Sequence, residues 1–320
     1  TVISLLFIKT GFDSGKKINK KNIKKLKLVW KYSSINKKDL NKKWKRHVEL
    51  NPVFINSKLI TVTPDSKVVA LNAENGTPLW EIKSEFPLTM RGLLVEYDKK
   101  LNLEVVYIPL AQVVYKINAN SGKIIKNFGS NGFIKAFTKV APIIYNDYLV
   151  IVGTKALFIF NKHTGEFISN IEIHPKDKNF SKGSVWGGAA VDIKKGIVYV
   201  ATGNPDPHIF NSKIIGSGDN KRANSIIAVD INKKKIIWDF QEISHDLWDL
   251  DIASPPIIHN LIIKEKIYEV LISVTKAGNT IILERNTGQP IFDIIYRAAP
   301  KSKIKGIVTS PFQIDLKKPE

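Results

Sequence analysis

The stretch KVVALNAENGTPLWEI, residues 67–82, contains a β-branched run, a polar turn with Gly76, and a second run with an aromatic residue near its end. Two such runs around a Gly-containing turn are typical of a β-hairpin. The same outline returns at 112–128, 156–171, 225–240 and 279–294. The corresponding turn positions are Gly122, Gly165, Gly288 and, in the copy at 225–240, Lys234 or a neighbour. The repeat predicts an all-β protein.

Most of these hairpins are preceded by a second pair of short apolar runs, at 51–64, 103–111, 141–154 and 196–204. Four antiparallel strands that recur every ~40 to 50 residues are typical of a β-propeller blade. We therefore expect a β-propeller of four-stranded antiparallel blades, with about five blades present. The run LKLVWKY at 26–32 predicts a further strand, which would complete a blade with strands from the far C-terminal part of the protein.

The expected boundaries follow from this repeat. Residues 1–25 form a basic N-terminal segment that is open to interpretation as the remnant of a signal peptide. Residues 26–298 are expected to form a partial propeller, and 299–320 a tail without a closing strand. A propeller protects its strand edges by closing into a ring, so we expect the chain to be the first part of a larger protein.

Composition excludes several kinds of function. The formal net charge is +20, but only five residues are Arg, and Lys is spread through the chain. Nucleic-acid readers usually concentrate Arg on one face, so we expect no nucleic-acid partner. The chain has no Cys, which excludes disulfides and thiolate chemistry. No apolar run approaches about 18 residues, so we expect no membrane span in this chain.

Several motifs depart from the repeat and resemble one family. They are SVWGGAAVD at 184–192, YVATGNPDP at 199–207, IIWDFQEISHDLWDLDIASPP at 236–256 and VTKAGNTIILERNTGQP at 274–290. In this order they resemble the quinoprotein dehydrogenases, which depend on pyrroloquinoline quinone (PQQ). The resemblance implies a propeller of eight blades that holds PQQ and Ca²⁺ on its axis.

The resemblance also implies roles for five residues. Trp186 would be the flat surface on which the quinone stacks, since Trp has the largest aromatic face. Asn204 would donate a side-chain oxygen to Ca²⁺, with Asp249 beside the metal as the general base for the substrate hydroxyl. Lys276 would bind the quinone oxygens and stabilise the reduced cofactor. Arg91 would lie nearest to the cofactor carboxylates.

The remaining residues of the acidic cluster SHDLWDLD at 244–251 are expected to be structural. His245, Asp246 and Trp248 would hold the shape of the loop by hydrogen bonds and packing. Asp251 has no assigned role.

The absence of Cys favours the glucose-dehydrogenase-like branch, because alcohol-oxidising relatives commonly place a ring of two bonded Cys over the quinone. The segment at 86–98 resembles that branch, although Pro87 stands where it has a His. The expected reaction is oxidation of an aldose such as glucose, or another hydroxyl compound, with electrons passed to a respiratory acceptor.

Localisation in the periplasm is expected, with attachment of the complete protein to the inner membrane left open.

Three alternative functions remain. They are an alcohol dehydrogenase of the same family, a non-catalytic propeller scaffold of the outer-membrane-assembly type, and a homologue that has kept the motifs without the activity.

Overall fold

The structure is a computed structural model, and it falls into two compact units that are described separately. The first unit contains Thr1–Pro142 and His163–Gly165, and the second contains Ile143–Lys162 and Glu166–Glu320. The residues that the structure describes are 18–34, 49–84, 91–110, 112–176, 182–206, 220–301, 303 and 309–316.

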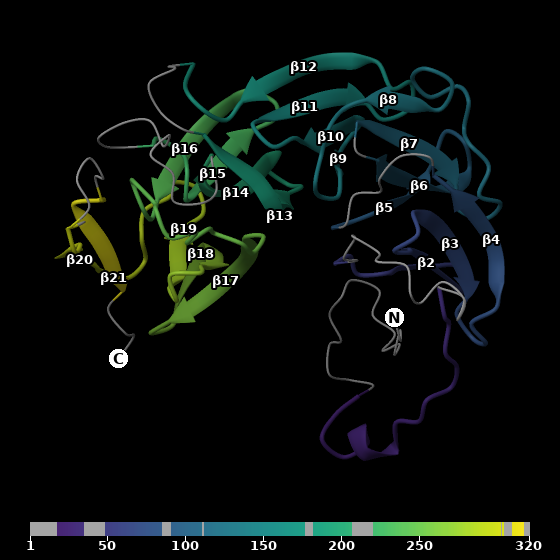
Figure 1. The fold of residues 1–320 in the computed structure, drawn as a ribbon, viewed down its shortest axis with the longest axis horizontal. Coiled ribbons are helices and arrows are strands. Elements are labelled where there is room, and N and C mark those ends of the chain that lie inside the picture. Colours follow the sequence, from purple (N-terminus) through teal and green to yellow (C-terminus); the bar gives the residue numbers. More distant parts are fainter. Residues whose placement is uncertain are drawn as a thin grey trace. The chain divides into compact units, whose positions relative to one another are not determined.

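The first unit contains two four-stranded antiparallel sheets in which each strand pairs with the next one along the chain (Figure 1). A short 3₁₀ helix, η1, precedes them at Ile23–Lys25. One sheet consists of β1 (Val53–Ile55), β2 (Lys58–Val62), β3 (Lys67–Asn72) and β4 (Pro78–Lys83). The other consists of β5 (Leu94–Asp98), β6 (Leu103–Leu110), β7 (Val113–Asn118) and β8 (Phe133–Lys135).

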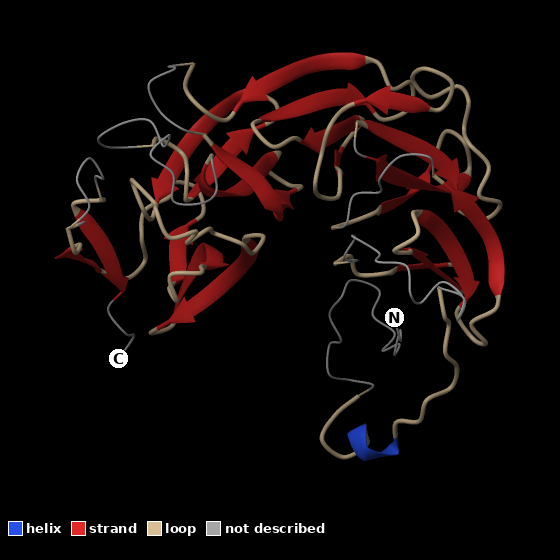
Figure 2. Ribbon diagram, viewed as in Figure 1, coloured by secondary structure: helices blue, strands red, loops and turns tan. Residues whose placement is uncertain are grey.

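The second unit continues the pattern, with strands in red throughout Figure 2. One four-stranded sheet consists of β9 (Ile143–Tyr145), β10 (Tyr148–Val152), β11 (Ala156–Asn161) and β12 (Phe167–Glu172). The next consists of β13 (Gly183–Asp192), β14 (Ile197–Pro205), β15 (Ser225–Asp230) and β16 (Lys235–Gln241). A three-stranded sheet contains β17 (Ile257–Ile263), β18 (Lys266–Val274) and β19 (Thr280–Glu284). A two-stranded sheet contains β20 (Ile294–Ala298) and β21 (Phe312–Leu316).

The all-β prediction and the hairpin turns are confirmed. Gly76, Gly122, Gly165 and Gly288 have φ between 70° and 75°, the left-handed conformation that Gly adopts at little cost. Lys234, in the copy that lacks Gly, has φ 52°. The turn geometry is therefore retained where the residue type is not.

Three of these turns, at Gly76, Gly122 and Gly288, also receive a Trp side chain from elsewhere in the same unit. The Trp80 indole of β4 lies on Gly122, and its Nε1 donates to the carbonyl oxygen of Ala119 at 3.0 Å. In the second unit, Trp238 of β16 lies on Gly288 and donates to the Arg285 carbonyl oxygen at 3.1 Å. Each of these two contacts joins the last strand of one sheet to a turn in the following sheet.

The structure bears on two expectations about strands. Among the described residues no β-ladder includes 26–32; instead, Trp30 of this run lies on Gly76 and donates to the Ala73 carbonyl oxygen at 3.0 Å. The run packs against β2 and β3 through Trp30 and Tyr32, and its pairing with strands from the far C-terminal part of the protein stays a prediction. Conversely, the expected tail contains β21, which pairs with β20.

Each unit has its own apolar core, made by the alternate residues of its strands that face inward. In the first unit, Ile60, Val106 and Ile117 belong to one buried cluster. In the second, Tyr199, Ile226 and Leu283 belong to another. These cores fix the strands whose ends carry the candidate site.

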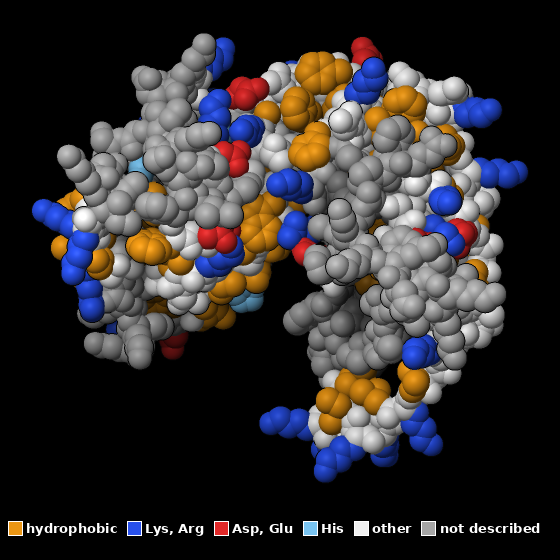
Figure 3. Space-filling model, viewed as in Figure 1, with side chains coloured by type: hydrophobic (Ala, Val, Ile, Leu, Met, Phe, Trp, Pro, Cys, Tyr) orange, Lys and Arg blue, Asp and Glu red, His pale blue; other side chains and the backbone are white. Residues whose placement is uncertain are grey.

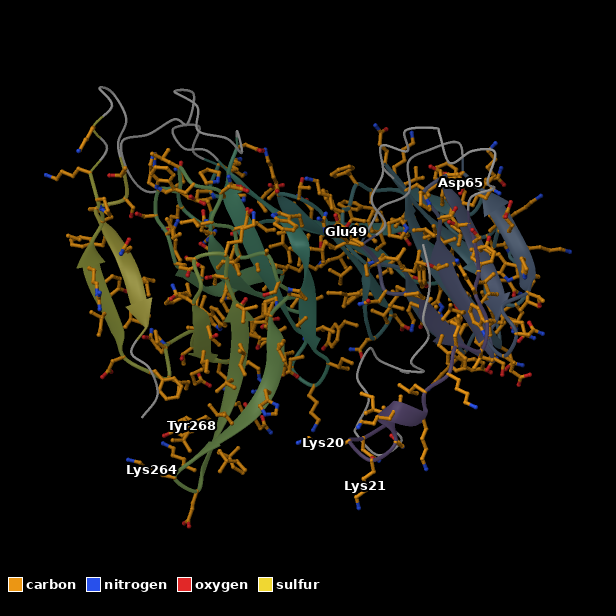
Figure 4. The ribbon with its side chains drawn as sticks, turned by 60° about the horizontal axis from the view of Figure 1, so that its bottom comes forward. Lys20, Lys21, Glu49, Asp65, Lys264 and Tyr268 are labelled. Carbon is orange, nitrogen blue, oxygen red and sulfur yellow. The ribbon has the colours of Figure 1, made fainter. Side chains whose placement is uncertain are left out.

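On the face drawn in Figure 3, Lys and Arg side chains are spread over the surface, and several of them lie together around η1. In Figure 4, Lys20 and Lys21 lie beside η1, and Lys264 lies at the turn between β17 and β18. Within the described residues no helix is long and apolar enough to cross a membrane.

Candidate cofactor site

Trp186 lies on β13, where the pairing with β14 shifts register between Val185 and Ala189. Such irregularities redirect side chains out of the regular sheet alternation. The next two residues are Gly187 and Gly188, and a Cβ at Gly187 would collide with the Ala253 carbonyl oxygen. The two glycines therefore let this strand pass close to residues 253–255 while Trp186 stays half-buried.

Asp251 is the carboxylate on which the neighbouring elements converge. It is only 3% exposed, and its Oδ1 accepts from the backbone N–H of Asn204 at 2.7 Å and from Nε1 of Trp186 at 3.3 Å. Its Oδ2 accepts from the Lys276 ammonium. Sequence reasoning left this residue without a role, although its position two residues after Asp249 placed it in the same cluster.

Lys276 lies in the turn between β18 and β19 and contacts Asp251, Asp249 and Trp186. Besides its bond to Asp251, its Nζ lies 3.0 Å from Oδ2 of Asp249. The same Nζ lies 5.5 Å from the ring centroid of Trp186, within the usual range of a cation–π contact. Its backbone N–H donates to the Asp251 carbonyl oxygen at 3.1 Å.

Asp249 differs from Asp251 in exposure and backbone conformation. Its side chain is 55% exposed, and its φ is 61°, a left-handed conformation that is uncommon outside Gly and Asn. This conformation turns the chain between Trp248 and Asp251, so the two aspartates approach Lys276 from different depths. Asp249 is therefore the carboxylate that an incoming molecule can reach.

Asn204 lies at the end of β14 and is buried. A Cβ on the preceding residue, Gly203, would collide with Oδ1 of Asp251 and lie 2.7 Å from Nε1 of Trp186. The Gly at this position therefore lets Asp251 and Trp186 meet over the strand. The assignment of Asn204 as a metal ligand stays a prediction.

The contacts of Asp251 and Lys276 determine the protonation states of these two side chains. Burial acts to raise the pKa of the Asp251 carboxyl, but hydrogen bonds from Lys276 and Asn204 outweigh it and hold this pKa below its usual value. Desolvation acts to lower the pKa of Lys276, but its bonds to Asp251 and Asp249 prevail and raise that pKa. At neutral pH Asp251 is a carboxylate and Lys276 an ammonium.

Three loop residues before Asp249 were expected to be structural, and two of them, His245 and Asp246, are buried. Asp246 is buried and accepts from the backbone N–H groups of Trp248 and Leu250, each at 2.7 Å. His245 is also buried, and its Nδ1 lies 3.1 Å from Nδ2 of Asn220. Trp248 was expected to hold the loop by packing, but it is 74% exposed, so this expectation is wrong.

Arg91 belongs to the other unit, where its guanidinium lies 2.5 Å from the Glu49 carboxylate. Glu49 is labelled in Figure 4. The structure thus brings together Trp186, Asn204, Asp249 and Lys276, while the assignment of Arg91 to the cofactor stays a prediction. Pro87 lies outside the described residues, as do residues 207–219 of the expected insert.

The chemistry of these residues fits a flat anion. A planar ring can stack on an indole, and the Lys276 ammonium beside that indole complements a carboxylate or a quinone oxygen. The fit to Ca²⁺ is partial, since Asn204 and Asp249 offer oxygen atoms of the kind that Ca²⁺ prefers. Among the described residues, no group of three His, Cys, Asp or Glu side chains could hold a metal ion.

The chain is similar in sequence to one family of known proteins. The sequence profile of the family described as "PQQ: Glucose/ethanol/alcohol dehydrogenase, beta-propeller domain" matches residues 8–154 and 172–315. Quinoprotein glucose dehydrogenase A of Acinetobacter calcoaceticus is 26% identical over 352 residues, covering 91% of this chain and 43% of that protein. Quinoprotein glucose dehydrogenase of Escherichia coli (strain K12) is 24% identical, covering 94% of this chain and 44% of that protein.

Solved structures agree on the fold. Quinohemoprotein alcohol dehydrogenase from Comamonas testosteroni superimposes with a TM-score of 0.65 at 20% identity, covering 84% of this chain and 46% of that one. The chain therefore spans less than half the length of these relatives. The prediction of a β-propeller with four-stranded blades is confirmed.

Proposed function

Because the chain belongs to the β-propeller family of PQQ-dependent glucose, ethanol and alcohol dehydrogenases, we propose that the complete protein oxidises the CH–OH group of a small sugar or alcohol. The observation that carries this proposal is one cluster of contacts. Asp251 accepts hydrogen bonds from the Trp186 indole and the Lys276 ammonium, and the same ammonium pairs with the Asp249 carboxylate. A scaffold has no need of such a cluster of charged groups beside an aromatic face.

Each residue has a distinct task in this proposal. Trp186 supports one face of the quinone, and Lys276 binds its oxygens as an ammonium. Asp249, the exposed carboxylate, accepts the proton of the substrate hydroxyl. PQQ, when bound, supplies the acceptor for the hydride that leaves the substrate carbon. Asp251 keeps Lys276 and Trp186 in place and stays out of reach of the substrate.

The proposal also names a metal, a substrate, an electron acceptor and a location. Ca²⁺ is proposed as the second cofactor because Asn204 and Asp249 offer oxygen ligands, and the remaining ligands would come from the quinone or from other parts of the protein. An aldose such as glucose is the preferred substrate, since two similar proteins are named glucose dehydrogenases and the chain has no Cys. A respiratory electron acceptor and a periplasmic location complete the proposal.

The test uses the full-length protein with added PQQ and Ca²⁺. We expect saturable quinone binding in an absorbance titration, and reduction of an artificial dye with aldoses or alcohols. Asp249→Asn should still bind the quinone, while its kcat falls by about 10²- to 10⁴-fold, the usual contribution of a general base.

The matched control is Asp293→Asn, which changes an exposed aspartate before β20 and should leave kcat unchanged. A wild-type protein that binds no quinone would refute the proposal and favour the scaffold. Equal turnover in Asp249→Asn and wild type would show that Asp249 is not the general base.

A further inference from the structure

The turn from Thr275 to Asn279 determines where the Lys276 ammonium lies. Its ends are joined by a hydrogen bond from the Thr275 N–H to the Asn279 carbonyl oxygen at 3.0 Å. Within the turn, the Gly278 N–H donates to the Thr275 carbonyl oxygen at 3.1 Å. Gly278 has φ 87°, and no atom lies within 4 Å of the position that a Cβ on it would take, so nothing packs against the turn from that side. The turn therefore needs support from its flanking residues.

Glu242 provides such support from the neighbouring sheet. It follows β16, and its Oε1 accepts from the Thr275 hydroxyl at 2.9 Å and from Nδ2 of Asn279 at 2.8 Å. One oxygen thus binds the two residues that close the turn around Lys276. The Glu242 backbone N–H donates to the Asn224 carbonyl oxygen at 2.9 Å, which fixes the residue to the start of β15.

The burial of Glu242 is unusual for a residue with only a fold-stabilising role. It is 4% exposed, and its second oxygen, Oε2, is buried without a hydrogen-bond partner in the structure. Buried carboxyl groups are costly unless they are fully paired. An apolar residue here would avoid this cost but would leave the Thr275 hydroxyl and the Asn279 amide without their acceptor.

We propose that Glu242 is a positioning residue that holds the Thr275–Asn279 turn so that the Lys276 ammonium stays beside Trp186. The contacts exist without any cofactor, but the importance of the position of Lys276 rests on the proposed function. Without Glu242, the turn loses both side-chain anchors. Lys276 then spends less time between Asp251 and the indole and more time in solvent.

The first measurement needs no quinone. Full-length protein is treated with an amine-acetylating reagent at pH 8, and mass spectrometry gives the modification rate of Lys276 relative to Lys264, an exposed lysine at the β17–β18 turn. Ion pairing suppresses the reactive neutral amine. We expect Glu242→Ala to raise this ratio about fivefold or more, because it removes both hydrogen bonds that Glu242 accepts from the turn.

Two further variants separate positioning from general stability. Glu242→Gln keeps an acceptor oxygen of the same reach, so its ratio should match wild type. Ile281→Val removes a methyl group from the buried core of β19 without touching the turn, and its ratio should also match wild type. An unchanged ratio in Glu242→Ala, or an equal rise in Ile281→Val, would overturn the proposal.

A quinone titration of the same variants links the position of Lys276 to the cofactor. We expect the dissociation constant to rise about fivefold in Glu242→Ala and to be unchanged in Glu242→Gln. An unchanged constant in Glu242→Ala would contradict the link to the cofactor. If the wild type binds no quinone, the proposed function fails, while the acetylation rates still decide the role of Glu242.

Discussion

At the scale of single residues, two aspartates that are two positions apart have different environments. Asp249 has a left-handed backbone and an exposed carboxylate, whereas Asp251 is buried and accepts hydrogen bonds from three groups. A general base must be reached by substrate, and a positioning group must be fixed by its partners. The structure provides one exposed and one buried carboxylate within one short loop, as the proposed roles require.

Asp251→Asn should lower the free energy of unfolding at pH 7 by about 1–2 kcal/mol, because the hydrogen bonds to an ionised acceptor are weakened. The folded-state pKa of Asp251 is lowered, so its stabilisation is present above its usual pKa of about 4 and is lost as the pH falls below that value. Urea unfolding of both proteins between pH 3 and 8 measures this. A stability difference that is as large at pH 3 as at pH 7 would contradict the assignment.

At the scale of elements, the hairpin turn combines a backbone requirement with a packing requirement. Gly288 has φ 74°, and a Cβ on it would lie 2.5 Å from Cε3 of Trp238. Gly278 has a similar φ of 87°, but no atom lies within 4 Å of its Cβ position. The two glycines therefore differ in what surrounds them and not in their backbone conformation.

Gly288→Ala should destabilise the protein by about 1–3 kcal/mol more than Gly278→Ala does, because both pay the left-handed backbone cost and only the first displaces an indole. Denaturant midpoints of the two variants measure the difference. Equal midpoints would mean that the Trp238 contact contributes nothing to stability.

At the scale of the whole molecule, the two units contain different polar interiors. The first unit contains a fully buried ion pair, with Nζ of Lys116 at 2.7 Å from Oδ2 of Asp98. Lys116 also lies 5.4 Å from the ring centroid of Tyr107 and 5.5 Å from that of Phe128. Burial acts to raise the pKa of Asp98, but its bond to Lys116 outweighs this and lowers it. The candidate cofactor site belongs to the second unit.

Lys116→Met should cost about 3–5 kcal/mol, because it leaves the buried Asp98 carboxylate without its ammonium partner. If the units open separately, hydrogen exchange should increase in β5–β8 and stay unchanged in the Thr275–Asn279 turn. Adding Asp98→Asn should recover part of the loss by removing the charge. An equal increase of exchange in both units would show that they unfold together.

The sequence alone predicted those features that depend on neighbours along the chain. The hairpins follow from alternating apolar residues and turn glycines, and four of these glycines have the expected positive φ. Family resemblance then identified Trp186, Asn204, Asp249 and Lys276, which the structure brings together. The packing of Trp248 was misjudged, because packing depends on which other segments lie beside a side chain.

The tertiary structure alone decided how the site is held. Asp251 meets partners 25, 47 and 65 positions away, and Glu242 meets partners 33 and 37 positions away in another sheet. Local pattern carries no information about such pairs, because burial and hydrogen bonding are set by which sheets become neighbours. The chemistry of the side chains is fixed by the sequence, whereas which of the two aspartates is buried and which is exposed is decided only on folding.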